Sequence, residues 1–120
     1  MHEIYFYRKS DGTEPVKEYL ELLARKKDKD SRINLNKIND YIEALSRYGL
    51  QLKEPYIKHM EGDIWELRPI KNRIFFVAWH NNGFVLLHHY RKQSPKTPKR
   101  ELERAKRCYI DLVERMVDNE

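Results

Sequence analysis

The sequence predicts a small α+β domain in which a strand, two helices, three strands and a final helix follow one another. Apolar residues recur at helical spacing early in the chain and again near its C-terminus. Aromatic and β-branched residues dominate short runs in the second half, with turn residues between them. The chain has 120 residues, of which 40% are hydrophobic. This length suits one modest core, so we expect a single domain over residues 1–120.

The first half predicts a strand followed by a hairpin of two helices. Residues 4–7 are aromatic and apolar, as in a strand. Thr13 and Pro15 suit the start of a helix, because proline costs little in the first turn. Two apolar groups at helical spacing follow: Val16, Tyr19, Leu20 and Leu23, then Leu35, Ile38, Ile42 and Leu45. Residues 25–32 are nearly all charged and predict a loop or a frayed helix end, and Gly49 suits the end of the second helix.

The second half predicts an antiparallel meander and a final helix. Residues 51–62 contain Pro55 and are expected to be irregular. Three strands are predicted over residues 63–68, 73–79 and 84–90, with Asn82-Gly83 as a hairpin signal before the last. A helix is expected to start at Thr97-Pro98. Its apolar face carries Leu102, Ala105, Tyr109, Leu112 and Met116.

Positive charge is concentrated in one stretch of the sequence. The net charge is +5, yet residues 88–107 alone hold eight basic and two acidic side chains. Such a stretch is typical of a phosphate-binding surface, although a solvated helix face is the plain alternative. The candidates for binding RNA are Arg91, Lys96, Lys99 and Arg100.

Several classes of protein are disfavoured by what the sequence lacks. With only 4 glycines there is no glycine-rich phosphate loop. The one cysteine, Cys108, cannot form a disulfide within the chain and is expected to pack inertly on the last helix. His88-His89 makes a poor metal pair because neighbours in a strand face opposite ways, so we expect neither a metal nor a cofactor. No apolar run is long enough to cross a membrane and no secretion signal opens the chain, which favours a cytoplasmic protein.

Polar groups gather at the ends of the predicted strands. Arg68 and Arg73 flank one turn, so their planar guanidinium groups can converge on one phosphate. His88 and Tyr90 share a side of the third strand, and Lys92 follows it. Two plainer interpretations stay open: Arg68 pairs with Glu66 on its own strand, or His88 is a half-buried structural residue.

Four segments together resemble the RelE/HigB toxin family, and most closely its phage-derived HigB-like branch. They are Gly-Asp-Ile-Trp-Glu-Leu-Arg at 62–68, Arg-Ile-Phe-Phe-Val at 73–77, Leu-Leu-His-His-Tyr-Arg-Lys at 86–92 and Lys-Thr-Pro at 96–98. The likeness covers residues 60–106, and the family fold, a small antiparallel sheet with two N-terminal helices, agrees with the predicted order of elements. Tyr90 and Gln93 depart from the branch, which usually has phenylalanine and lysine there.

The resemblance implies a toxin of a type II toxin–antitoxin system that cleaves messenger RNA on the translating ribosome, without a metal, by using the RNA 2′-hydroxyl. In that role Arg68 and Arg73 would hold the scissile phosphate and Lys92 would stabilise its developing charge. His88 or Tyr90 would move a proton or position the nucleotide. The implied partners are the ribosome, messenger RNA and a HigA-like helix-turn-helix antitoxin that binds the toxin in an oligomer.

Two other functions fit the same sequence. A ParE-like toxin that inhibits DNA gyrase would share the fold but would not need the set of Arg68, Arg73 and Lys92. A non-catalytic nucleic-acid-binding module would use the basic stretch at 88–107 and leave RNA intact.

Overall fold

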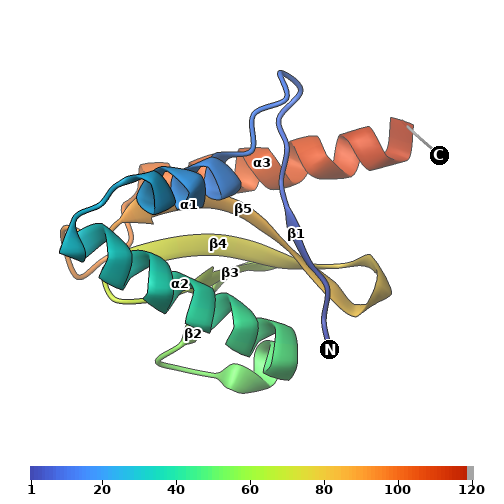
Figure 1. The fold of residues 1–120 in the computed structure, drawn as a ribbon. Helices are drawn as coiled ribbons and strands as arrows, with labels where there is room; N and C mark the ends of the chain where they lie inside the picture. Colours follow the sequence, from blue (N-terminus) through green and yellow to red (C-terminus); the bar gives the residue numbers. More distant parts are fainter. Residues whose placement is uncertain (119–120) are drawn as a thin grey trace.

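A computed structural model describes residues 1–118 as a five-stranded sheet with helices on both faces (Figure 1). The elements are β1 (Ile4–Phe6), α1 (Pro15–Arg25), α2 (Lys29–Tyr48), β2 (Ile57–Glu61), β3 (Ile64–Leu67), β4 (Asn72–Trp79), β5 (Gly83–Arg91) and α3 (Lys99–Asp118). Short 3₁₀ turns lie at Gly49–Leu52 and His80–Asn82. The α+β fold class and the two N-terminal helices and one C-terminal helix are confirmed.

The sheet has the strand order β1-β5-β4-β3-β2. The predicted meander forms its centre, because β3, β4 and β5 pair antiparallel in sequence order. At one edge β1 pairs with β5 in parallel, and at the other edge β2 pairs antiparallel with β3. The three predicted strands are therefore confirmed and extended by one strand on each side.

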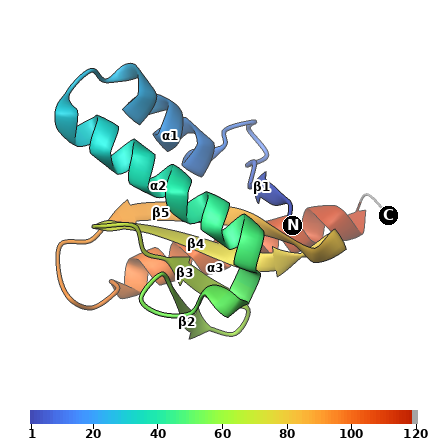
Figure 2. The same cartoon turned by 60° about the horizontal axis from the view of Figure 1, so that its bottom comes forward.

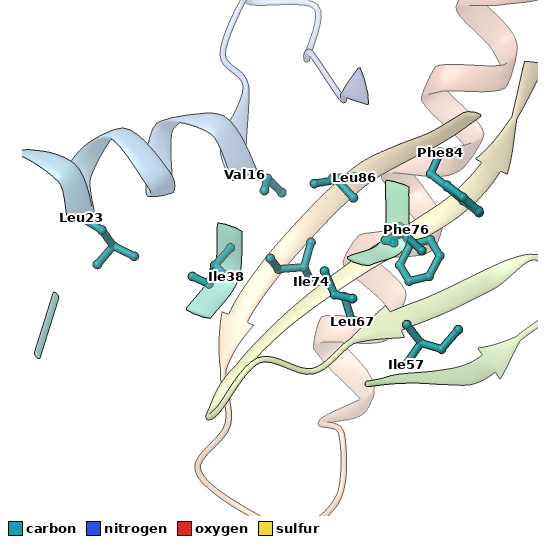
Figure 3. Packing of buried hydrophobic residues seen from close by; sticks show 10 residues of the cluster. Val16, Leu23, Ile38, Ile57, Leu67, Ile74, Phe76, Phe84 and Leu86 are labelled. Carbon is teal, nitrogen blue, oxygen red and sulfur yellow. The ribbon is translucent and has the colours of Figure 1, made fainter. Parts of the chain in front are cut away.

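The α1–α2 hairpin covers one face of this sheet, and α3 covers the other (Figure 2). Under the hairpin, Val16 and Leu23 of α1 and Ile38 of α2 pack on the sheet residues Ile74 and Leu86 (Figure 3). All five are at most 5% exposed. Their burial follows from the helical spacing seen in the sequence, since one apolar stripe of each helix faces the sheet.

The loop between the two helices is shorter than the charge pattern predicted. We expected a loop or frayed end over residues 25–32, but α2 already begins at Lys29. The carboxylate of Asp28 accepts hydrogen bonds from the backbone N–H of Ser31 at 2.9 Å and from its hydroxyl at 2.8 Å. This N-cap satisfies a free donor of the first helical turn, so a highly charged segment still forms a helix.

The strand β2 was not predicted, because its burial does not alternate. Of its five residues, only Ile57 is buried and only Met60 is partly buried, and these two lie three positions apart. The register of β2 against β3 shifts between His59 and Glu61, which leaves an extra residue in the strand. A bulge of this kind breaks the period of two by which a strand is recognised, so the prediction of an irregular segment over residues 51–62 was wrong for its last part.

A second bulge, in β5, determines which of its side chains face α3. Phe75 of β4 pairs with His88 of β5, while Phe76 pairs with Leu86. Leu87 is the extra residue. Both Leu87 and His88 consequently face α3: Leu87 is fully buried beside Phe75, and His88 stacks on the Phe75 ring with centroids 6.0 Å apart. Strict alternation would have separated Leu87 from His88.

Candidate functional site

A buried carboxylate lies at the centre of the polar groups that the sequence placed at the strand ends. The side chain of Glu66 on β3 is 0% exposed. Its Oε1 lies 3.2 Å from Arg68 Nε and 3.8 Å from Arg73 Nε. Burial of a charged group is costly unless the group is paired, so the two arginines stabilise this carboxylate. The alternative in which Arg68 pairs with Glu66 is therefore present in the structure.

The second oxygen of the same carboxylate connects β3 to β5 and to the start of α3. Glu66 Oε2 accepts a hydrogen bond from the Tyr90 hydroxyl at 3.3 Å and from the Thr97 hydroxyl at 3.1 Å. Burial raises the pKa of the Tyr90 hydroxyl above its ordinary value, and the charge of Glu66 adds to the rise. Tyr90 is therefore a protonated donor at neutral pH.

Arg68 and Arg73 differ in how freely they can reach a ligand. Arg73 is 6% exposed, and its Nη1 donates to the carbonyl of Ile70 at 2.9 Å and to that of Asn72 at 2.8 Å. Burial, together with the nearby charge of Arg68, lowers the pKa of the Arg73 guanidinium. Arg68 keeps 21% of its side chain exposed. Arg73 thus stabilises the turn between β3 and β4 through its hydrogen bonds, while the more exposed Arg68 is the more accessible of the two to a ligand.

An open hollow of about 530 Å³ lies where β5 ends and α3 begins. Tyr90 lines it together with three basic residues: Arg91, Lys96 and Arg100. Thr97 and Glu101 also line this space, which we call the Tyr90 hollow. Three of the four predicted RNA-binding residues therefore line the same hollow as Tyr90, whose hydroxyl bonds to the buried Glu66.

The other predicted site residues lie outside the Tyr90 hollow. Lys92 lines an adjacent hollow that shares Gln93 and Ser94 with it. Lys99 is exposed at the first position of α3 and does not line the Tyr90 hollow. His88 lines a separate hollow beside the end of β1. The structure therefore brings Tyr90 and Arg68 together on Glu66, with Lys92 nearby, and sets His88 apart.

The two neighbouring histidines face opposite sides of the sheet, as expected. His88 Nε2 lies 2.8 Å from Glu101 Oε1 on α3, whereas the His89 ring stacks on Tyr19 of α1 with centroids 4.3 Å apart. Burial lowers the pKa of His88 below its ordinary value and the pKa of His89 to about 4. Within residues 1–118, no group of three or more His, Cys, Asp or Glu side chains is placed to hold a metal ion.

Sequence reasoning missed the parts played by Glu66, Thr97 and Glu101. Glu66 was considered only as a partner that would occupy Arg68, yet its carboxylate joins three strands and the segment that leads into α3. The usable signal was its place two residues before Arg68, on the same side of a strand. Glu101 pairs with His88 across 13 residues, and its position one turn into the predicted helix was the only available hint.

The comparison with known families identifies the chain's relatives. Residues 21–109 match the model of the family described as phage derived protein Gp49-like (DUF891). The chain belongs to this Gp49-like family. The matched region runs from within α1 into α3, so it contains Glu66, Arg68, Tyr90 and the whole Tyr90 hollow. It also contains the segments whose resemblance pointed to a phage-derived group.

Two further findings complete the comparison. No curated protein matches the chain. In the described part of this Gp49-like protein, none of the helices has the length and apolar character that a membrane crossing requires.

Proposed function

We propose that this Gp49-like protein is a toxin of a type II toxin–antitoxin system that cleaves messenger RNA on the translating ribosome. Family membership and the likeness of residues 60–106 to RelE/HigB toxins support the proposal. The observation that carries it is the position of Tyr90, which lines an open basic hollow while its hydroxyl bonds to a buried carboxylate. A basic hollow is suited to the backbone of an RNA strand, and a bonded hydroxyl is suited to moving a proton.

The cations around Tyr90 fit the binding of RNA and the stabilisation of charge. Arg91, Lys96 and Arg100 would hold backbone phosphates at the Tyr90 hollow. Arg68 and Lys92 would stabilise the charge that builds on the phosphoryl oxygens when the 2′-hydroxyl attacks. Removal of one well-placed donor of this kind commonly costs roughly two to three decades of rate.

Tyr90 stands where the HigB-like branch usually has phenylalanine, so its contact with Glu66 offers this chain a route of its own for the proton of the attacking 2′-hydroxyl. Tyr90 would accept that proton while it passes its own to Glu66, toward which its hydroxyl already points at 3.3 Å. The 2′-oxygen bonds to phosphorus, the bond to the 5′-oxygen breaks, and the Lys92 ammonium protonates the departing oxygen. The product would carry a 2′,3′-cyclic phosphate, and no metal is required.

The geometry favours narrower roles for Arg73 and His88 than the resemblance implied. Two backbone carbonyls occupy Arg73 Nη1, so we assign Arg73 the positioning of Glu66 and of the turn. Glu101 occupies His88 Nε2, and His88 lines a different hollow, so Tyr90 is the better proton carrier.

The implied partners and location are part of the same proposal. A HigA-like helix-turn-helix antitoxin would form an oligomer with the toxin and neutralise it. Action on the ribosome would place the protein in the cytoplasm. A basic toxin surface favours an antitoxin that brings acidic residues to it.

Controlled expression in bacteria tests the proposal against its rivals. The wild-type chain should arrest growth and fragment messenger RNA while plasmid supercoiling stays normal, and Arg68→Ala and Lys92→Ala should relieve the arrest. Loss of supercoiling with intact messenger RNA would favour a gyrase inhibitor instead. RNA binding without arrest or cleavage would leave only a non-catalytic binding module.

A further inference from the structure

A second basic hollow lies beside β5, past the end of β1 and between the start of the loop to α1 and the residues of α3, apart from the Tyr90 hollow. It has a volume of about 440 Å³ and forms where the chain after β1 approaches β5 and α3. We call it the Lys9 hollow. Its ionisable lining groups include Lys9, His88, His89, Arg104, Arg107 and Cys108. It shares no lining residue with the Tyr90 hollow or with the hollow that holds Lys92.

The cations of the Lys9 hollow are poorly neutralised. Among the side chains that the structure describes, neither Lys9 nor Arg107 has a carboxylate within 4.0 Å, and no Asp or Glu lines the hollow. Arg104 Nη1 lies 3.8 Å from Glu101, whose carboxylate also contacts His88. Positive charge thus exceeds negative charge around this space, which favours an anionic ligand.

The charges converge on the hollow from three elements. Burial raises the pKa of the Cys108 thiol, the charge of Asp111 adds to the rise, and the charges of Lys9 and Arg107 oppose it. Burial lowers the pKa of His88 and the bonded Glu101 carboxylate opposes that fall, while the charges of Arg104 and Lys9 add to it. Lys9 therefore acts on both the strand and the helix that line the hollow, although it belongs to neither.

The loop that carries Lys9 holds its backbone in place. The Lys9 N–H donates to the Thr13 carbonyl at 2.8 Å, and the Lys9 carbonyl accepts from the Gly12 N–H at 2.9 Å. His89 also lines the hollow, and its buried Nδ1 has no hydrogen-bond partner among the side chains that the structure describes. The hollow is thus lined by a lysine whose backbone is held and by a histidine that has an unpaired buried nitrogen, which is uncommon for a polar atom.

We propose that the Lys9 hollow binds a phosphoryl group, supplied by the backbone of an RNA strand or by free phosphate. Arg104 and Arg107 lie on neighbouring positions of one helix face, and their planar groups match phosphate oxygens in pairs. Lys9 adds a point charge from the loop that follows β1. The RNA source rests on the proposed function, whereas phosphate binding itself does not.

A titration with inorganic phosphate at constant ionic strength tests the site directly. The resonances of His88, His89 and Cys108 should shift in the wild-type protein and in the control Lys37→Ala, which removes an exposed cation of α2. The double variant Lys9→Ala/Arg107→Ala should bind phosphate about tenfold more weakly or worse. Both residues are exposed, so the double variant should keep the wild-type fold. Absent shifts, or equal shifts in the double variant, would overturn the proposal.

A short single-stranded RNA then distinguishes the two sources of phosphate. If a backbone phosphate occupies the hollow, the double variant should lower the slope of log affinity against log salt by about 0.7 for each lost contact. An unchanged slope together with lost phosphate binding would support free phosphate as the ligand. Tyr90→Phe and Arg68→Ala should still bind phosphate here, so lost messenger RNA cleavage in those variants tests the proposed function separately.

Discussion

The hydroxyl of Tyr90 on β5 donates a 3.3 Å hydrogen bond to the carboxylate of Glu66, which lies fully buried two strands away on β3. This bond crosses the central strand β4 and joins the open hollow to the interior of the domain. The same carboxylate meets Arg68, Arg73 and Thr97, so one acidic side chain organises the end of the sheet. The proposed chemistry and the local stability therefore depend on the same group.

Replacement of Glu66 should destabilise the domain strongly. Glu66→Ala leaves the buried Arg73 without its carboxylate, and breaking a buried ion pair from one side typically costs about 3–5 kcal/mol of unfolding free energy. Glu66→Gln keeps the shape and an acceptor for Tyr90, so it should cost clearly less. Urea unfolding measures both values.

The exposed pair Glu43–Arg47 provides the control for that measurement. Glu43 Oε1 lies 3.1 Å from Arg47, but both side chains are more than half exposed. Glu43→Ala should therefore change the unfolding midpoint very little. An effect of Glu66→Ala as small as that of Glu43→Ala would show that the buried cluster does not hold the sheet end together.

Stability should fall as the pH is lowered from about 6.5 toward 4, in part because of His89. Burial lowers the pKa of His89 to about 4 in the folded chain, whereas an unfolded histidine titrates at about 6.5. Below 6.5 the unfolded state binds the proton first, so folding loses stability until the folded state is protonated too, a loss on the order of 3 kcal/mol.

His89→Phe should remove much of that pH dependence. The phenyl ring keeps the stack on Tyr19 but cannot take up a proton. Urea unfolding at a series of pH values from 7 to 4 compares it with His80→Phe, which changes an exposed histidine. Equal acid sensitivity of His89→Phe and the wild type would contradict the role given to His89.

RNA affinity should depend on salt through the residues of the Tyr90 hollow. The double variant Lys96→Ala/Arg100→Ala removes two exposed cations that line it. For single-stranded RNA the slope of log affinity against log salt should become shallower by about 0.7 per lost phosphate contact. A filter-binding series at increasing salt, with Lys37→Ala as the control, measures the slope. A double variant with the wild-type slope would place the RNA elsewhere.

The sequence predicted most of the fold because the relevant patterns are local. The stripes led by Val16 and Ile38, the Asn82-Gly83 turn and the start at Thr97-Pro98 each depend on residues close in the chain. The strand β2 was missed because a bulge disrupts its alternation, and the start of α2 was missed because one cap, Asp28, outweighs a run of charges. The parallel pairing of β1 with β5 joins residues about 80 positions apart, so no local sequence pattern predicts it.

The sequence predicted which residue types form the candidate site, but not which of its side chains contact one another. The basic stretch supplied Arg91, Lys96 and Arg100 as candidates for binding RNA, and the structure shows that these three line one hollow. The sequence could not indicate that Glu66 would occupy the space between Arg68 and Arg73, because that depends on the register of β3 against β4. The sequence also could not indicate that His88 and Tyr90, which share a side of β5, would line different hollows.

Messenger RNA cleavage in a translating extract, with the fragment ends mapped, tests the central claim most directly. The wild type and Lys37→Ala should yield fragments with 2′,3′-cyclic phosphate ends only when ribosomes translate the message. Tyr90→Phe should slow cleavage by roughly two decades or more, and Arg68→Ala by a similar factor, while both remain folded. Cleavage at the wild-type rate by Tyr90→Phe and Arg68→Ala, or intact message with the wild type, would contradict the account.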